Sequence, residues 1–276
     1  MNRRQRGVAL ISVLLVMSLA LLIIGTVLRS HRLLLQGTGQ QLQQIQLRQL
    51  GMAGEGWALA QLMAQQNNSD LIAQRSTTLE LESTPVQVDI EDLAGRFNLN
   101  AVLVSGQIDQ VTLKRWARLL DLLALPPLKL EQVGALRELS QLRLVAGVDG
   151  QTLHRLEPWV ALLPTDAALN INTAPALVLR SLDGLEAATV DALLRQRSTT
   201  PWSSVQTFTL DPLLSGLGLN SQGLGIDSRW YRITVQVPQG QRWLQWVTDV
   251  ERDAKTRELK ILQRRILPSV SHEMTP

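Results

Sequence analysis

The longest apolar stretch of the chain lies close to its N-terminus. Residues 8–28 form a run of 21 residues without a charge, in which Ser12, Ser18 and Thr26 carry the hydroxyl groups. A helix of this length is about 30 Å long, which matches the hydrocarbon thickness of a membrane. The run therefore predicts a membrane-spanning helix over 8–28.

Apolar residues at helical spacing continue beyond this run, with glutamines between them. They predict one helix face, formed by Leu42, Ile45, Ala53, Trp57 and Ala60. We therefore expect a single N-terminal helix over 8–66, whose first half lies in the membrane. Glycines in its second half predict a kink or a break, at Gly37, Gly39, Gly51, Gly54 and Gly56.

Strict alternation of apolar and polar residues marks five strands. Two precede a long interval without strand signals, and three follow it: 78–82, 86–92, 230–237, 242–250 and 258–266. This order predicts one antiparallel sheet built from residues 67–95 and 228–268, followed by a tail over 269–276. The fold class is therefore α+β, with a large inserted domain over 96–227.

The insertion has helical periodicity. Helices are predicted at 109–125, 135–145 and 152–164, the last of them broken by Pro158, and a pair of helices follows within 171–208. In this pair, Thr173 is expected to cap a helix that starts near Pro175 and ends at Gly184, and a second helix runs over 187–197. The pair has the outline of a helix-hairpin-helix, so we predict an all-helical insertion.

Composition and charge limit the possible functions. The chain has 276 residues, a formal net charge of +3 and no cysteine. The lack of cysteine excludes disulfides, thiol catalysis and cysteine-ligated metal centres. Arg3, Arg4 and Arg6 account for the whole net charge, so the chain beyond residue 7 is formally neutral. A nearly neutral protein is a poor candidate for electrostatic binding of nucleic acid.

Three kinds of N-terminal segment are compatible with the apolar run. A cleaved secretory signal is disfavoured, because the run is long and "TVLRSHRLLL" after it lacks a small-x-small cleavage site. A plain membrane anchor fits the hydropathy. The third kind is a prepilin-like leader, which Arg6-Gly7-Val8 resembles: a short basic segment, a glycine and then the apolar helix. The arginines predict a cytoplasmic N-terminus.

Catalytic chemistry has no support in the sequence, and we expect no enzyme. His31, His154 and His272 are scattered without ligand spacing, and no nucleophile, P-loop or zinc-protease motif occurs. The glycine-rich stretch 215–225 is expected to be a flexible loop, and the tryptophans are expected to be core residues. A DNA-binding hairpin is also disfavoured, since Asp183 and Glu186 flank its turn and would repel phosphate.

Several stretches together resemble one family, the minor pseudopilin K of type II secretion systems. They follow the prepilin-like leader in the family's order and cover nearly the whole chain: "DLAGRFNLN" (92–100), "ELSQLRLVAGV" (138–148), "WVALLP…LNINTAPALVL" (159–179), "RSTTPWSSVQTF" (197–208) and "SRWYRITVQV" (228–237). The resemblance implies a pilin-like scaffold: a long N-terminal helix and an antiparallel sheet, with a helical domain inserted in the sheet.

The resemblance also implies a role and a processing site. Residues 1–7 would be a leader that prepilin peptidase removes after Gly7, leaving Val8 as a methylated N-terminus. The protein would then be a single-pass inner-membrane protein with a periplasmic domain. It would join the minor pseudopilins I and J, the major pseudopilin and the assembly platform, and initiate or cap the pseudopilus at its tip. The alternative is a type IV minor pilin for adhesion or DNA uptake.

The chain differs from most pilins at one position, and it lacks one motif that many members of the pseudopilin K family have. Most pilins have a glutamate as the fifth residue of the processed chain, where it is thought to pair with the terminal amine of the next subunit; here that residue is Ser12. An unpaired carboxylate in a membrane is costly, so its absence fits a subunit with no neighbour above it. The family's acidic calcium-binding stretch is not matched in 122–140, where the acids are Glu131 and Glu138. We therefore expect no cofactor or metal.

Overall fold

The computed structural model describes residues 3–64, 74–104, 107–130, 134–145, 147–239 and 242–267. The described helices are α1 (Arg3–Ala64), α2 (Gln110–Leu122), α3 (Gly150–Leu156), α4 (Ala176–Arg180), α5 (Ala187–Thr199) and α6 (Val205–Thr209), with 3₁₀ turns at Leu93–Gly95, Leu99–Val102, Leu139–Leu144 and Pro212–Leu214. The strands are β1 (Gln74–Leu81), β2 (Thr84–Asp92), β3 (Phe97–Asn98), β4 (Leu103–Val104), β5 (Gln107–Ile108), β6 (Val160–Ala161), β7 (Leu169–Asn170), β8 (Leu224–Gly225), β9 (Trp230–Gln239), β10 (Arg242–Arg252) and β11 (Leu259–Leu267). The chain divides into two units, Met1–Met52 and Ala53–Pro276.

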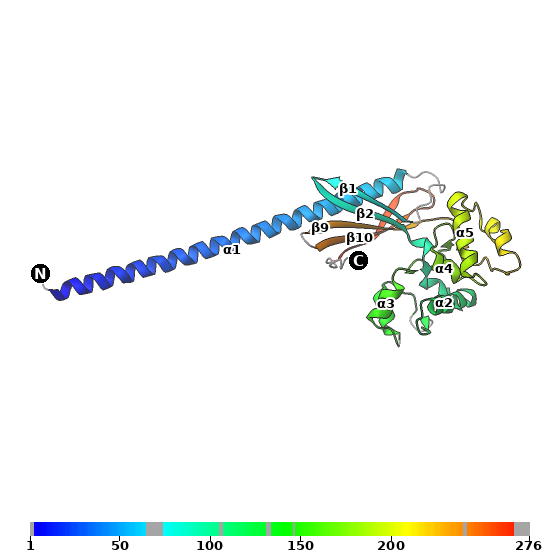
Figure 1. Ribbon diagram of the computed structural model, residues 1–276, viewed down its shortest axis with the longest axis horizontal. Helices are drawn as coiled ribbons and strands as arrows, with labels where there is room; N and C mark the ends of the chain where they lie inside the picture. Colours follow the sequence, from blue (N-terminus) through cyan, green and yellow to red (C-terminus); the bar gives the residue numbers. More distant parts are fainter. Residues whose placement is uncertain are drawn as a thin grey trace. The chain divides into compact units, whose positions relative to one another are not determined.

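The predicted five-stranded antiparallel sheet is confirmed. Its strand order is β1-β2-β9-β10-β11, so β2 and β9 are neighbours although the whole insertion separates them along the chain (Figure 1). The register pairs Val88 with Val235 and Ile90 with Ile233, and these four residues are fully buried. A one-residue slip would turn them to the opposite face, so burial of one face fixes the register.

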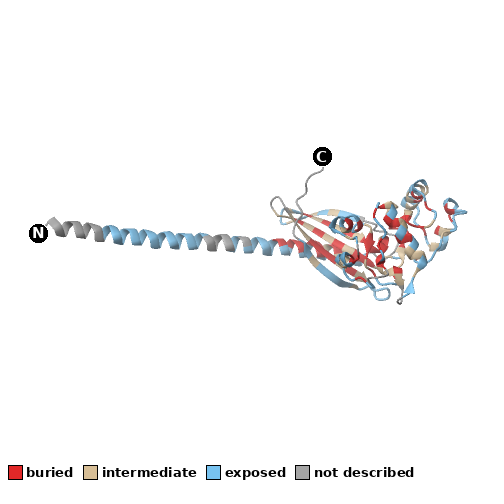
Figure 2. Ribbon diagram, turned by 90° about the horizontal axis from the view of Figure 1, so that it is seen from below, coloured by how far each residue is buried: buried red, intermediate tan, exposed pale blue. Residues whose placement is uncertain are grey.

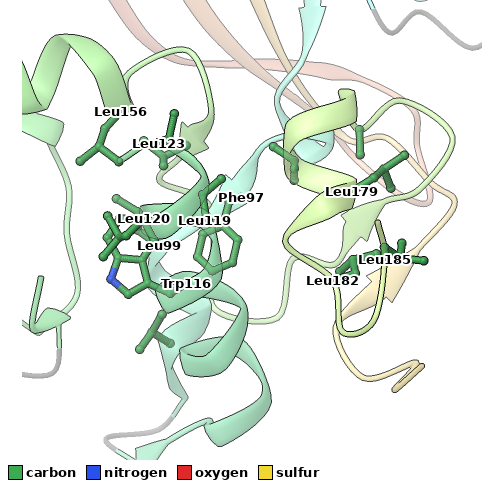
Figure 3. Packing of buried hydrophobic residues seen from close by; sticks show 14 of the residues in the cluster. Phe97, Leu99, Trp116, Leu119, Leu120, Leu123, Leu156, Leu179, Leu182 and Leu185 are labelled. Atoms are coloured by element: carbon green, nitrogen blue, oxygen red, sulfur yellow. The ribbon is translucent and has the colours of Figure 1, made fainter. Parts of the chain in front are cut away.

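The insertion has a hydrophobic core of its own, built mainly from leucines (Figure 3). Trp116 and Leu119 of α2 are at its centre, and the ring of Phe97 lies 5.6 Å from that of Trp116. The indole N–H of Trp116 donates to the carbonyl oxygen of Leu128 at 3.0 Å, so this buried polar atom is satisfied. Four tryptophans of the protein are buried, as expected of core residues: Trp116, Trp202, Trp230 and Trp246.

The insertion is less helical than its periodicity predicts. In place of a helix over 135–145 there is only the 3₁₀ turn Leu139–Leu144. The physical reason lies at Leu136, whose N–H donates to Asn100 Oδ1 at 2.7 Å and whose carbonyl accepts from Asn100 Nδ2 at 3.0 Å. These side-chain bonds replace the backbone bonds of a helix.

The break predicted at Pro158 is found, but the residues after it are not helical. Helix α3 ends at Leu156, and Val160–Ala161 pairs with β3 as a short parallel strand. The pairs β4–β5 and β7–β8 also lie in the insertion. Residues 215–225, expected to be a flexible loop, include β8, and Arg115 donates to the carbonyls of Asn220 and Gln222 at 2.6 Å each.

Candidate assembly site

The predicted processing site lies at the start of α1. The backbone of Gly7, Val8 and Ser12 is part of this helix, but the side chains of residues 1–12 lie outside the described residues. Further along, Val13–Arg32 is long and apolar enough to cross a membrane, and none of it is buried inside the protein (Figure 2). The structure therefore contains an apolar N-terminal helix suited to anchoring, while cleavage after Gly7, methylation of Val8 and the role of Ser12 stay predictions.

The break predicted in α1 does not occur, and the face of α1 that is buried is one that the sequence did not predict. From Gly54 to Leu62 the residues against the sheet are Gly54, Glu55, Ala58 and Leu62, all buried. The predicted break does not occur because Gly54 serves close packing. A Cβ built there would lie 2.7 Å from Val235 Cγ1 and 3.3 Å from Val88 Cγ2. The glycine thus lets the helix backbone approach the sheet.

The residues predicted to share one helix face do so, and apart from Trp57, which is partly buried, they are exposed. At 100° per residue this face is opposite the buried one. In the first unit its exposed residues are Leu42, Ile45, Gln49 and Met52, and in the second unit they are Ala53, Gly56, Ala60 and Met63, so the face is mostly apolar. We call this set the outer face of α1. Its composition is that of a helix that packs on both sides.

An ion pair between a buried carboxylate and an exposed arginine fixes the last turns of α1 on the sheet. Glu55 is 3% exposed, and its Oε1 accepts from Arg264 Nε and Nη2 at 3.1 and 2.9 Å. Its Oε2 accepts from the indole N–H of Trp246 at 3.2 Å. Nearby, Arg252 donates to the carbonyl of Leu62 at 2.6 Å, which satisfies one of the acceptors left free at the end of a helix. The carboxylate is therefore a docking group for the helix.

Asp92 joins the sheet to the insertion. It is the last residue of β2, where the chain leaves the sheet, and Ser228 stands just before β9, where the chain returns. Asp92 Oδ2 accepts from Ser228 Oγ and Thr173 Oγ1 at 2.5 Å each and from Asn170 Nδ2 at 3.2 Å. Its Oδ1 accepts from the N–H of Ala94 at 2.9 Å. Four donors thus converge on one buried carboxylate, and we call this cluster the Asp92 joint.

The predicted role of Thr173 is corrected by this cluster. Thr173 does not cap the next helix: α4 begins at Ala176 with Pro175 as its N-cap residue and without a side-chain cap. The Thr173 hydroxyl donates to Asp92 instead, and its carbonyl lies where a side chain on Gly95 would fall, 2.9 Å from a Cβ built there. Close packing at the joint therefore requires the glycine of "DLAG".

The asparagines of the two quoted motifs hold the backbone of the insertion. Asn98 accepts from the N–H of Leu163 at 3.1 Å and donates to the carbonyl of Pro164 at 2.7 Å. Asn172 accepts from the N–H of Trp202 at 3.0 Å and donates to its carbonyl at 2.8 Å. Each amide supplies one donor and one acceptor, which is what an unpaired backbone segment needs. Their role in the insertion is therefore structural, which sequence reasoning missed.

The Asp92 carboxyl is strongly perturbed. Burial raises its pKa from 3.8 to about 6, and the hydrogen bonds from Ser228, Thr173, Ala94 and Asn170 offset part of that rise. Because the folded-state pKa lies above the unfolded value, the folded protein binds a proton here more tightly than the unfolded chain. This contribution to stability grows as the pH falls through 6 and is complete below 3.8.

We expect a matching pH dependence of folding. Relative to Asp92→Asn, the unmodified protein should gain about 1.4 kcal/mol in the free energy of unfolding between pH 7.5 and pH 5. Urea unfolding of both proteins in detergent micelles, followed by tryptophan fluorescence at several pH values, measures this difference. A difference between the two that does not change with pH would contradict the assignment.

A metal site and a phosphate-binding hairpin are the two other kinds of site to consider among the described residues. No group of three or more His, Asp or Glu residues there is placed to hold a metal ion. The helix pair α4–α5 is present, with Gly184 in the left-handed region at φ 76°. Glu186 stands at the N-cap of α5, where its charge would oppose a phosphate.

Comparisons with known proteins agree with this architecture. The family model described as type II secretion system (T2SS), protein K matches residues 169–227. Type II secretion system protein K of Klebsiella pneumoniae is 26% identical over 319 aligned positions, which cover 96% of this chain and 97% of that protein. The protein of the same name from Pseudomonas aeruginosa is 24% identical, with 96% and 93% covered.

A solved structure has the same fold. It comes from the crystal structure of the GspK-GspI-GspJ complex of the enterotoxigenic Escherichia coli type 2 secretion system, with a TM-score of 0.70 and 20% identity over 84% of this chain and 99% of that one. The matched family model lies in the segment that includes Asn170, Asn172 and Thr173. Together with relatives aligned over nearly their full length, it shows that the chain is similar along almost its whole length to type II secretion system protein K.

Proposed function

We propose that the protein is a minor pseudopilin at the tip of the type II secretion pseudopilus, where it initiates or caps assembly. It works through binding surfaces and has no catalytic, cofactor or calcium site. The observation that carries this proposal is the outer face of α1, which is apolar and exposed opposite the face that packs on the sheet. Such a helix needs a second partner to cover it.

The comparisons support particular partners. The solved structure with this fold was determined as a complex with GspI and GspJ. We therefore propose the I-type and J-type minor pseudopilins as direct partners, with the major pseudopilin and the inner-membrane assembly platform as further ones. Small residues on the outer face, Ala53, Gly56 and Ala60, would let a partner helix approach closely.

The N-terminal segment supports an inner-membrane origin. Arg3, Arg4 and Arg6 precede the apolar helix and favour a cytoplasmic N-terminus, which places residues beyond the span in the periplasm. Prepilin peptidase would cut after Gly7 and leave Val8 to be methylated. Ser12 then stands at the fifth position, where no carboxylate requires a terminal amine from a subunit above.

The insertion supports a terminal position in the fibre. It occupies the interval between β2 and β9 and has its own hydrophobic core, so it is a domain added to one end of the sheet (Figure 1). A bulky domain there would obstruct the addition of another subunit. The Asp92 joint would keep this domain in a fixed orientation.

Two measurements test the proposal together. The intact protein from membranes that contain prepilin peptidase should have the mass of a chain starting at Val8 with one added methyl group, and Gly7→Leu should block the cut. Full-length protein in detergent should also co-purify with the I-type and J-type pseudopilins of the same organism. An intact Met1, or DNA binding without a ternary complex, would refute the proposal.

A further inference from the structure

The last strand of the sheet has an unusual edge. β11 follows β10 in the strand order, and within the described residues no strand pairs with its other side. Four of its large aliphatic side chains are between 40% and 48% exposed: Ile261, Leu262, Ile266 and Leu267. A long edge with exposed aliphatic residues offers free backbone donors and acceptors beside an apolar surface.

The opposite edge of the same sheet is different in character. β1 presents Ser76, Thr77 and Thr78 along its middle, and no large aliphatic residue of its described side chains is more than partly exposed. The two edges belong to one sheet and differ in what they could bind. An apolar partner strand would find matching side chains at β11 and not at β1.

Charge narrows the choice of partner. β11 carries Lys260, Arg264 and Arg265 and no acid. In the ion pairs of the described residues, Arg264 binds Glu55, Arg265 and Arg232 bind Asp249, and Arg229 binds Glu251, while Lys260 lies opposite Glu251 in the ladder. Asp249 alone accepts from Arg232 at 2.7 and 2.9 Å and from Arg265 at 3.4 Å. The edge therefore has a surplus of positive charge that an acidic strand would neutralise.

The same features oppose pairing between two copies of this chain. Two β11 edges side by side would bring their lysines and arginines together, and like charges on facing strands are destabilising. The ladder also passes from the Asp249–Gln263 pair to the Val250–Ile261 pair, which leaves Leu262 as a bulge. A bulge and positive charges at a sheet edge oppose pairing with arbitrary strands. They still allow pairing with a strand that carries negative charges at matching positions.

We propose that β11 is a docking edge for an extended strand with two adjacent aliphatic residues and two adjacent acidic residues, so that each face of the strand carries one of each, and that this strand is supplied by another subunit of the pseudopilus. The regular stretch Gln263–Leu267 would pair with it through backbone hydrogen bonds, and Ile266 and Leu267 would contact its aliphatic residues. Arg264 and Arg265 would contact its carboxylates. This proposal rests on the proposed function, because the strand comes from a partner in the assembly.

Hydrogen exchange of the full-length protein in detergent tests the docking edge. The probe is the pair of I-type and J-type pseudopilins of the same organism, and the protein is compared alone and with both present. Exchange of the β11 amides over 263–267 should slow by about tenfold or more in the complex, while exchange in β1 stays unchanged. A complex that leaves β11 exchange unchanged overturns the docking edge and leaves the proposed function standing. Failure to form any complex overturns both.

Matched variants add a readout that folding does not confound. Lys260→Gln removes an exposed charge without placing two acids opposite each other, and it should weaken the complex, with a larger effect at low salt. Ile266→Lys should weaken it by about tenfold, because it places a charge among the contacting aliphatic residues. Thr78→Lys, on the opposite edge, should change the affinity less than about twofold. Equal losses for Ile266→Lys and Thr78→Lys would overturn the proposal.

Discussion

Replacement of Asp92 by alanine should lower the free energy of unfolding by about 3 kcal/mol at pH 7. The substitution removes the acceptor of the Ser228 and Thr173 hydroxyls and of the Ala94 N–H in a buried site, whereas Asn170 Nδ2 keeps its bond to Ser228 Oγ at 2.6 Å. Each unsatisfied buried donor costs about 1–3 kcal/mol. The variant no longer has to bury a carboxylate, but the free energy gained in this way offsets only part of that cost. The loss should be larger at pH 5 than at pH 7, because protonation of the carboxyl in the folded protein adds more stability at the lower pH.

Asp89→Ala is the matched control for this change. Asp89 lies on the same strand but is only partly buried, and its recorded side-chain bond is a 3.5 Å contact with Gln87. Its replacement should change the free energy of unfolding by less than about 0.5 kcal/mol. Urea unfolding in detergent micelles, followed by tryptophan fluorescence, compares the two variants. Equal losses would show that the Asp92 joint does not hold the sheet and the insertion together.

Gly54→Leu should destabilise the protein by about 3 kcal/mol or more, whereas Gly56→Leu should stabilise it by about 0.8 kcal/mol. At Gly54 the first added carbon already lies 2.7 Å from Val235 Cγ1, and the valines it meets belong to the stiff, buried face of the sheet. At Gly56 no atom lies within 4 Å of a Cβ, so leucine replaces glycine in an open helix position.

The pair of glycine variants also tests the orientation of α1. If the helix packed on the sheet through the face that the sequence predicts, Gly56 would be nearer the sheet and the order of the two effects would change. Thermal unfolding of both variants in detergent, followed by circular dichroism and tryptophan fluorescence, gives the two signs. A stabilising Gly54→Leu would contradict the close approach of helix and sheet.

The face of α1 that packs on the sheet shows a limit of predicting structure from hydrophobic periodicity. Leu42, Ile45 and Ala60 have the spacing of a core face, and the sheet takes the face of Gly54, Ala58 and Leu62 instead. Periodicity identifies an apolar face but does not say which surface covers it. Close packing prefers small residues at the contact, so a glycine that weakens an isolated helix is favourable in this one.

The insertion shows a second limit. The apolar spacing of 135–145 is helical, yet the amide of Asn100 takes both backbone groups of Leu136. Likewise, the local sequence predicts that the hydroxyl of Thr173 caps a helix, but in the structure this hydroxyl donates to Asp92. Side chains that meet across 36 and 81 positions of sequence leave no local signal, so a reading of neighbouring residues assigns them local partners.

The sequence by itself determined the membrane-length helix, the five strands and their division by an insertion, because each depends on periodicity within a few residues. Its motifs in order also pointed to the proteins that the comparisons find similar, type II secretion system protein K. Only the tertiary structure decided which face of α1 is covered, that Asp92 gathers four donors where the chain leaves and re-enters the sheet, and that β11 is an edge. These features depend on which distant segments come into contact. Those contacts are decided by the burial of side chains, by how closely two backbones can approach and by the need to pair buried charges, and local spacing does not specify them.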